Sequence, residues 1–189
     1  MNQDKIKEAV SVLARGGSVI YPTDTLYGLG VDATNKQAIG RLSKLKGRDP
    51  EKGLSVMVAS VEAIEKIAVL TPEMKKLLAT RLPGPYTFIL KYRHIQAIAL
   101  ACRYDGNVAV RVPDHPVARA LARAFGKAIT ATSANLSGKK PLNSLKSLNS
   151  LGADYVLWAG PLPLAQPSTI VDLTKEKPRV LRRGAGQWP

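Results

Sequence analysis

Cysteine and histidine are nearly absent from this chain of 189 residues, and aromatic residues are few. The single cysteine, Cys102, excludes an intrachain disulfide and a cysteine-based zinc site. Of the two histidines, His94 is expected at the surface, and His115, which precedes Pro116, is expected to begin a helix. Aromatic residues make up 5% of the chain, too few for a platform on which single-stranded bases stack.

Long apolar runs are also missing. No stretch of about 18 apolar residues occurs, so no transmembrane helix and no membrane partner are expected. The first residues are polar and charged and lack a signal-peptide pattern, which makes the cytoplasm the expected location. The length and the 45% of hydrophobic residues predict a single domain over 1–189, with a core of about 6–184. A short C-terminal tail from Gly184 is expected to be frayed.

Acidic residues are half as numerous as basic ones, with 14 Asp and Glu against 28 Lys and Arg and a formal charge of +14. Such an excess favours polyanionic partners, either RNA or the phosphates of a nucleotide. It is also found in proteins whose basicity only serves solubility. Charge alone leaves these alternatives open, because the basic residues are spread along the chain in short clusters.

Hydrophobic periodicity and helix-end signals predict an α/β fold. Helices begin after Asn35, at Thr71-Pro72 and at Asp114-His115-Pro116, and Gly126 ends the last of these. Helices are expected over 6–13, 35–46, 61–68, 72–80, 116–125 and 144–151. Strands are expected over 18–21, 54–59, 86–91, 108–112, 128–131, 155–158, 169–173 and 180–182. Strands alternate with helices early and cluster late, which predicts a mixed twisted sheet flanked by helices.

Polar segments interrupt this apolar pattern at the ends of strands and helices. Such segments converge on clefts in α/β folds, where ligands bind. They supply hydroxyls, an amide and positive charge but few carboxylates, which suits an anionic ligand such as a nucleotide. The segments are Tyr21–Gly28, Lys46–Arg48, Thr130–Gly138 and Pro167–Thr169.

The sequence contains neither of two common phosphate-binding motifs in a convincing form. Residues 28–33, Gly-Leu-Gly-Val-Asp-Ala, fit a relaxed dinucleotide fingerprint, but residues 22–27 separate them from the preceding strand. The alternative is a loop in which glycine permits positive φ or a close backbone approach. No Walker A sequence occurs, because neither Gly126-Lys127 nor Gly138-Lys139 is followed by Ser or Thr. Nucleotide phosphates must therefore be held in another way.

Lys46 and Arg48 lie at or just past a helix end. They either interact with the helix C-terminus or, with Lys52, clamp a phosphate. Ser133 and Asn135 follow a strand, where they either cap the next element or bind phosphate and sugar oxygens. Ser133 lacks a nucleophile elbow, so it is not expected to be a nucleophile.

Arg111 interrupts an apolar strand and shares a face with Ala109. Its guanidinium requires an anionic partner, which is either a structural carboxylate or the carboxylate of a ligand. Arg182 and Arg183 are adjacent, so at most one of them is expected to point into a cleft.

Taken together and in order, these segments resemble the YrdC family, and within it the single-domain synthases of the TsaC type. The resemblance covers about residues 6–184. It rests on Pro22–Gly30, Lys46–Arg48, Pro83–Pro85 with Thr87, Val108–Pro113, Ser133–Gly138, Ser168–Asp172 and Arg182–Gly184.

The resemblance implies a twisted sheet with a deep, positively charged cavity. It implies nucleotidyl transfer: L-threonine, bicarbonate and ATP give threonylcarbamoyladenylate and pyrophosphate. The product serves threonylcarbamoyladenosine modification of tRNA, together with the threonylcarbamoyl-transferase proteins of that pathway. Mg²⁺ is expected to arrive on the ATP phosphates, because the sequence offers no dedicated metal site. Direct contact with tRNA or double-stranded RNA is left open.

The resemblance also implies roles for particular residues. Lys46 and Arg48 are the expected catalytic residues. The ATP-binding positions that it implies are Arg48, Lys52, Asn107, Ser133, Asn135 and Arg182. The threonine-binding positions that it implies are Thr25, Arg111, Ser168 and Ala131, the last through its backbone.

Gly53 and Met57 stand where some relatives have Pro and His, which affects the expected closure over ATP and the threonine side of the pocket.

Two other functions compete with the synthase. One is a non-catalytic module that binds structured RNA through a basic concave surface. The other is an accessory domain that transfers a carbamoyl group to a different acceptor.

Overall fold

The computed structural model describes residues 3–49, 53–93, 98–163 and 165–189, so Lys52 and His94 lie outside the described residues. The helices are α1 (Gln3–Ala14), α2 (Lys36–Lys46), α3 (Val61–Ile64), α4 (Pro72–Arg81), α5 (Pro116–Phe125) and α6 (Leu145–Asn149), with a 3₁₀ turn, η1 (Leu100–Cys102). The first five strands are β1 (Val19–Tyr21), β2 (Gly28–Gly30), β3 (Ser55–Met57), β4 (Tyr86–Lys91) and β5 (Arg103–Tyr104). The other five are β6 (Asn107–Arg111), β7 (Ile129–Ser133), β8 (Tyr155–Val156), β9 (Thr169–Asp172) and β10 (Arg179–Arg182).

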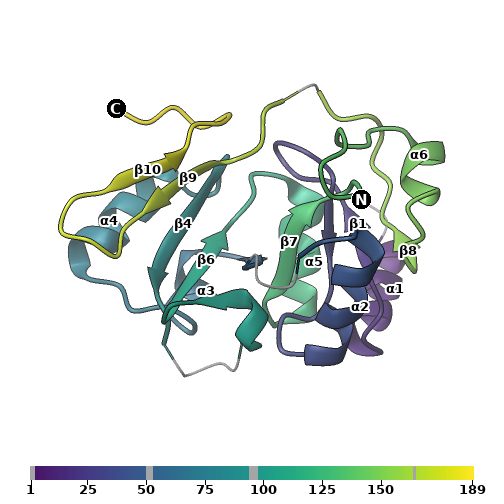
Figure 1. Cartoon of the computed structure of the whole chain (residues 1–189), viewed down its shortest axis with the longest axis horizontal. Helices are drawn as coiled ribbons and strands as arrows, with labels where there is room; N and C mark the ends of the chain where they lie inside the picture. The colour runs from purple at the N-terminus through teal and green to yellow at the C-terminus, as the bar shows by residue number, and fades with distance from the viewer. Residues whose placement is uncertain (1–2, 50–52, 94–97, 164) are drawn as a thin grey trace.

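The strands form one mixed sheet in the order β10-β9-β4-β6-β3-β7-β2-β1-β8, and β5 pairs with β6 at the side of this path. The pairs β1–β8, β3–β6 and β4–β9 are parallel, and the other neighbours are antiparallel. The sheet twists strongly from β10 at one end to β8 at the other (Figure 1). The predicted mixed α/β fold is therefore confirmed.

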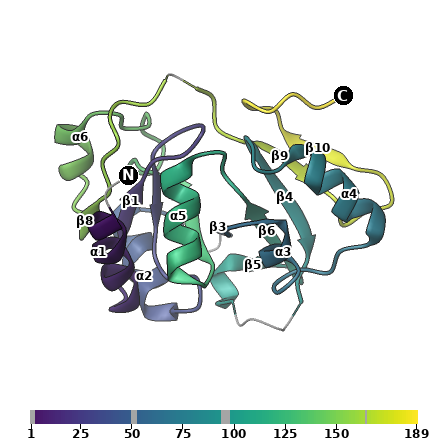
Figure 2. The same ribbon diagram turned by 180° about the vertical axis from the view of Figure 1, so that it is seen from behind.

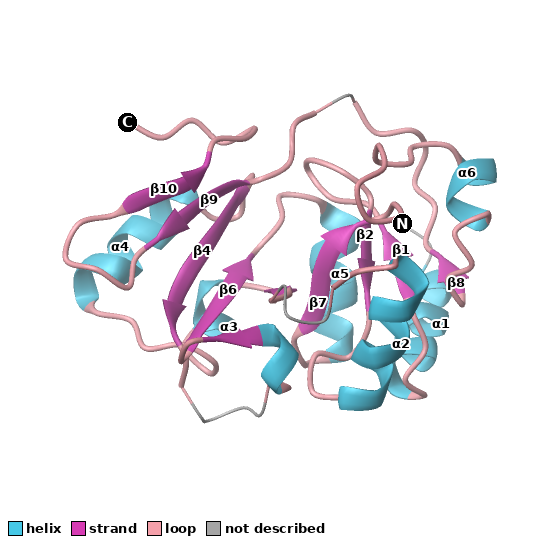
Figure 3. Cartoon of the chain, in the orientation of Figure 1, coloured by secondary structure: helices cyan, strands magenta, loops and turns pink. Residues whose placement is uncertain are grey.

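Helices cover both faces of the half of the sheet that holds β1, β2 and β7. The strand β1 explains this arrangement, because its side chains alternate between two buried clusters. Val19 and Tyr21 pack with α1 and α5, whereas Ile20 packs with α2. Figures 2 and 3 show α1 and α5 on one side of these strands and α2 on the other.

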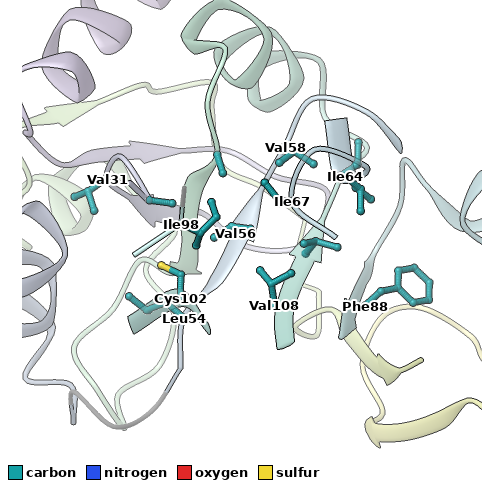
Figure 4. Close-up of a cluster of buried hydrophobic side chains, with 14 of the residues drawn as sticks. Val31, Leu54, Val56, Val58, Ile64, Ile67, Phe88, Ile98, Cys102 and Val108 are labelled. Carbon is teal, nitrogen blue, oxygen red and sulfur yellow. The ribbon is translucent and has the colours of Figure 1, made fainter. Parts of the chain in front are cut away.

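The other half of the sheet is covered on one face only. Phe88 and Val110 lie opposite each other on β4 and β6, and they belong to the same buried cluster as Ile64 and Ile67 beside α3. Figure 4 shows part of this cluster, and Figure 2 shows α3 and α4 over this face. The side chains at the alternate positions point to the opposite face, where the candidate site lies.

The helix ends form as the sequence predicts. Asn35 caps α2 by accepting a hydrogen bond from the Ala38 amide, and Thr71 caps α4 ahead of Pro72. His115 begins α5 as its N-cap, as expected. Gly126 ends α5 in the left-handed region with φ of 73°, which favours glycine. Within the described ranges, no helix combines the length and apolar character needed to cross a membrane.

Residues 28–30 are a strand, not the loop that was predicted. Neither Gly28 nor Gly30 has positive φ. Both glycines allow a close approach instead, because a Cβ atom at Gly28 would lie 2.7 Å from the Tyr21 ring and one at Gly30 would overlap the Thr130 carbonyl. The predicted close backbone approach is confirmed and the predicted positive φ is wrong. A dinucleotide turn does not form, because β2 runs between β1 and β7.

Several other boundaries differ from the prediction, for example those of one helix and one strand. The helix expected over 61–68 ends at Ile64, after which the chain turns and Ala68 bridges to Tyr92. The strand expected over 128–131 extends to Ser133, because Gly28 on β2 pairs with Ser133.

The C-terminal tail is packed, which corrects the expectation that it is frayed. The Tyr86 hydroxyl donates to the Gln187 carbonyl oxygen at 2.6 Å. The Trp188 ring packs edge-on against Tyr86 and Phe88, and the Arg81 guanidinium lies 5.3 Å from the Trp188 ring centre.

Candidate active site

A cavity of about 600 Å³ lies on the face of the sheet opposite α3 and α4. Its floor is made by alternate residues of neighbouring strands, such as Ile89 on β4, Ala109 on β6 and Asp172 on β9, which lie side by side in register. The loop after β1 and the end of β7 form one wall, and β10 forms the opposite wall. The polar segments at the strand ends therefore meet in one place.

Most of the predicted site residues reach this cavity. Those that line it are Thr25, Arg48, Asn107, Arg111, Ala131, Ser133, Ser168 and Arg182. Lys46 and Asn135 are not among the described lining residues, and Lys52 lies outside the part of the chain that the structure describes.

Arg111 has a structural carboxylate as its partner. Its Nη2 atom lies 2.7 Å from Oδ1 of Asp24 and 3.3 Å from the hydroxyl oxygen of Thr25. The two charged side chains are only 11% and 10% exposed. Nε of Arg111 and Oδ2 of Asp24 are buried and have no hydrogen-bond partner among the described residues. Asp24 thus fixes the guanidinium at the end of β6, where it faces the cavity.

The loop that carries Asp24 and Thr25 is held by Thr23. Its hydroxyl oxygen accepts from the amides of Thr25 and Leu26 at 3.1 and 3.2 Å, and the hydroxyl donates to the Leu26 carbonyl at 2.6 Å. This local pattern is typical of Thr and Ser in turns. The repeated threonines of the segment therefore form a rigid turn beside Arg111.

Ser168 and Arg182 form a second polar group in the cavity. Arg182 donates to the Ser168 carbonyl oxygen through Nη2 at 2.7 Å and Nε at 3.1 Å. The hydroxyls of Ser168 and Thr87 share a hydrogen bond of 2.8 Å. Partial burial and then the charge of Arg111 lower the pKa of Arg182. Arg183 does not line the cavity and donates weakly to the Trp188 carbonyl, so only one of the adjacent arginines enters it, as predicted.

Lys46, the last residue of α2, turns inward and is only 3% exposed. Its ammonium donates to the backbone carbonyls of Ser133 and Asn135, and Nζ lies 3.3 Å from Oδ1 of Asn135. Burial, and secondarily the charge of Arg48, lower the pKa of Lys46 to about 8. Lys46 therefore lies behind the cavity wall and ties α2 to the loop after β7.

Asn135 organises the same loop. Oδ1 of Asn135 accepts from the Ser133 hydroxyl at 2.6 Å, and its side-chain amide donates to the carbonyls of Leu136 and Lys139. Its polar atoms are thus engaged within the loop, as one of the two sequence interpretations expects. Ser133 differs from it because its side chain lies in the cavity lining.

Arg48 and Asn107 lie near the other end of the cavity from Arg111. Nη2 of Arg48 donates to the Gly53 carbonyl at 2.9 Å, and Nδ2 of Asn107 donates to the Asp105 carbonyl at 2.9 Å. Partial burial lowers the pKa of Arg48, an effect that the charge of Asp49 opposes.

Sequence reasoning missed several lining residues. Ser55, Tyr104 and Lys175 line the cavity but were not singled out. Ser55 begins β3 opposite Ala131 and donates to its carbonyl oxygen at 2.6 Å. Side chains alternate between the two faces of the strand expected over 54–59, and this alternation could have identified Ser55 as a residue on the cavity face. The other two lie on strands or turns that the sequence does not mark as part of the site.

The two departures from the family pattern have different positions. Gly53 lines the cavity, whereas Met57 is fully buried in the cluster between the sheet and the helices α1 and α5. Met57 is therefore a core residue and is not among the described residues that line the cavity.

Cations outnumber carboxylates among the described lining residues. The cations are Arg48, Arg111, Lys175 and Arg182, and the carboxylates are Asp105 and Asp172. Within the described ranges, no group of three or more His, Cys, Asp or Glu side chains is placed to hold a metal ion. The chain is thus an α/β protein whose sheet carries a large cavity lined by three arginines and one lysine among the described residues.

Comparisons with known proteins agree with this architecture. A family model for the Sua5, YciO and YrdC proteins, described as "Telomere recombination", matches residues 11–184. A curated relative from Methylobacillus flagellatus, named threonylcarbamoyl-AMP synthase, is 38% identical over 164 residues, which are 85% of this chain and 91% of that protein.

Two solved structures superpose on nearly the whole chain. The P. abyssi Sua5 structure in complex with L-threonine matches with a TM-score of 0.89 and 32% identity, covering 97% of this chain and 55% of that one. The E. coli YciO structure matches with a TM-score of 0.89 and 27% identity, covering 98% and 92%. The chain belongs to the Sua5/YciO/YrdC family.

Proposed function

We propose that this chain synthesises L-threonylcarbamoyladenylate from L-threonine, bicarbonate and ATP, with release of pyrophosphate. One observation carries the proposal: Thr25, Arg111 and Ser168 share a single cavity with Arg48, Asn107 and Ser133. The names of the relatives and the threonine-bound Sua5 structure support the same activity. The enzyme is a nucleotidyltransferase.

The cavity is long enough to hold threonine and ATP next to each other. Asn107 and Arg111 stand at opposite ends of β6, separated by four residue steps or about 13 Å. An amino acid at one end and a nucleotide at the other bring the amine of the former toward the α-phosphate of the latter.

At the threonine end, the Arg111 guanidinium is the group for the substrate carboxylate. Arginine offers forked donors that match a carboxylate, and Asp24 occupies only one side of this fork. The hydroxyls of Thr25 and Ser168 lie nearby as groups for the amine and hydroxyl of threonine.

At the nucleotide end, Arg48 and Ser133 are the groups proposed for the phosphates. Arg182, which donates to Ser168 at the threonine end, is proposed to reach the phosphates from that side. Lys46 and Asn135 lie behind the cavity wall, where their hydrogen bonds shape the loop that carries Ser133. The position of Lys52 beside them remains a proposal from the sequence. Mg²⁺ enters as part of the ATP complex, because phosphate oxygens and water suit it better than the isolated carboxylates of this cavity.

The proposed reaction proceeds through a carbamate. Bicarbonate and a proton give CO₂ and water, and the neutral amine of threonine attacks CO₂ and loses a proton to form the carbamate. A carbamate oxygen then attacks the α-phosphorus of ATP, and the bond to the β-phosphate oxygen breaks to release pyrophosphate. The arginines stabilise the charge that develops on the phosphates, which is electrostatic catalysis.

We further propose that the product serves tRNA modification. Other proteins of the pathway, the threonylcarbamoyl-transferase complex, would move the threonylcarbamoyl group to an adenosine of tRNA. A cytoplasmic location follows from where ATP and tRNA are found. Contact of this chain with RNA itself is a separate proposal, which its charge of +14 supports only in general terms.

Pyrophosphate release tests the proposal. The synthase releases pyrophosphate only when ATP, threonine and bicarbonate are all present, whereas a non-catalytic RNA-binding module releases none and binds RNA with steep salt dependence. Arg182→Ala and Arg183→Ala are a matched pair, because they remove the same charge from adjacent positions inside and outside the cavity. We expect Arg182→Ala to lose about ten- to hundred-fold in rate and Arg183→Ala to keep it. Release that does not depend on threonine overturns the proposal.

A further inference from the structure

The exposed ring of Tyr104 lines the cavity but has no part in the reaction steps proposed for it. Three tyrosines line the cavity. Tyr21 and Tyr27 are each 1% exposed, and their hydroxyls donate to the carbonyls of Thr130 and Gly160. Tyr104 is 72% exposed. An aromatic ring at a cavity rim that packs into no core is available for a ligand.

The backbone fixes this ring on the cavity side of the sheet. Tyr104 ends β5 and pairs directly with Asn107, the first residue of β6. Paired residues share a face, and Asn107 in turn shares the face of Ala109 and Arg111, which line the cavity. The preceding residue, Arg103, points to the other face, where its guanidinium lies 4.9 Å from the centre of the Tyr92 ring.

The hairpin that holds Tyr104 has a tight two-residue loop. Asp105 and Gly106 both have positive φ, 47° and 71°, which is the pattern of a type I′ turn. Such a turn matches the twist of the paired strands, so the position of Tyr104 is set by the strand register. Tyr104 also lies close to Gly53, the residue whose carbonyl accepts from Arg48.

The substrates of the proposed function identify what Tyr104 contacts. Arg111 occupies the end of β6 that faces the amino acid, and Tyr104 stands at the other end, about 13 Å away. Among threonine, bicarbonate and ATP, only the adenine base has a flat aromatic face. We infer that Tyr104 stacks on the adenine of ATP and closes the base end of the cavity. This inference rests on the proposed function.

Binding of Mg²⁺·ATP without threonine or bicarbonate tests the inference, measured by calorimetry on the full chain. Tyr104→Ala is expected to weaken ATP binding about ten-fold, because stacking on one base contributes about that much. Inorganic tripolyphosphate with Mg²⁺ is the matched probe without a base, and its affinity is expected to stay unchanged. Tyr104→Phe keeps the ring and is expected to restore ATP affinity.

Leu100→Ala is the control, because Leu100 is 74% exposed on the neighbouring η1 and is not among the described lining residues. Wild-type ATP affinity in Tyr104→Ala overturns the inference and leaves the proposed function intact. An equal loss for ATP and tripolyphosphate also overturns it, because the base is then not what Tyr104 contacts. Failure of the wild-type chain to bind ATP overturns the proposed function and this inference together.

Discussion

The ammonium of Lys46 lies 2.7 Å from the backbone carbonyl oxygen of Asn135, to which it donates a hydrogen bond. It also donates to the Ser133 carbonyl, so one buried cation at the end of α2 holds the loop that follows β7. The cation therefore supports the cavity from behind, and its removal affects both folding and the site.

Replacement of Lys46 by Met is expected to destabilise the protein by about 2–3 kcal/mol, because two buried carbonyl oxygens lose a charged donor. Urea unfolding measures this change. Lys44→Met, at an exposed position in the same last turn of α2, is the control and is expected to have little effect. If the two variants were equally stable, the hydrogen bonds of Lys46 would not stabilise the packing of α2 against the loop.

The pH dependence of stability carries a signature of the same residue. The pKa of Lys46 is about 8 in the folded chain against an ordinary 10.5, so the folded state loses this proton first as pH rises. Between about pH 8 and 10.5 the unfolded state binds more protons, so the contribution of Lys46 to the free energy of unfolding increases with pH. We expect wild type to gain on the order of 1 kcal/mol per pH unit relative to Lys46→Met in this window. Urea titrations of both proteins at several pH values measure it, and parallel curves refute it.

Arg111→Lys tests the geometry at the threonine end. Lysine keeps the charge but has no fork with which to hold Asp24 and a substrate carboxylate together. We expect the KM for threonine to rise at least about ten-fold, with a much smaller change in the KM for ATP. Steady-state pyrophosphate release gives both constants, with Arg183→Lys as the control. A rise confined to the KM for ATP would place the carboxylate elsewhere.

Trp188→Ala tests the packed tail. The Trp188 ring contacts Tyr86 and Phe88 and lies under Arg81, so its loss removes a partly buried aromatic cluster. We expect a loss of about 2 kcal/mol in the free energy of unfolding. Val69→Ala, a truncation at an exposed position, is the control in the same thermal or urea assay. If Trp188→Ala unfolds like the wild-type chain, the tail contributes nothing to stability.

Local signals in the sequence predict much of this fold. Asn35, Thr71 and His115 mark helix starts because a side-chain atom within three residues satisfies the first amides. The strand β2 was missed because Gly-Leu-Gly has low strand propensity and forms only between β1 and β7. Tertiary pairing, which local sequence does not encode, decides that segment.

The site was predictable in composition but not in geometry. The polar segments after the strands predict that Thr25, Arg111 and Ser168 converge. They do not predict that Asp24 pairs with Arg111 across 87 residues of sequence. They also do not predict that Lys46 turns behind the wall, because a lysine at a helix C-terminus is usually solvated.

The proposed activity joins carbon from bicarbonate to threonine and AMP. The most direct test incubates the protein with ATP, Mg²⁺, L-threonine and ¹³C-bicarbonate and analyses the nucleotide products by mass spectrometry. We expect a product with the mass of threonylcarbamoyladenylate that becomes heavier by a single mass unit with the labelled bicarbonate. A threonine-dependent adenylate whose mass does not change with the label would contradict the proposed activity.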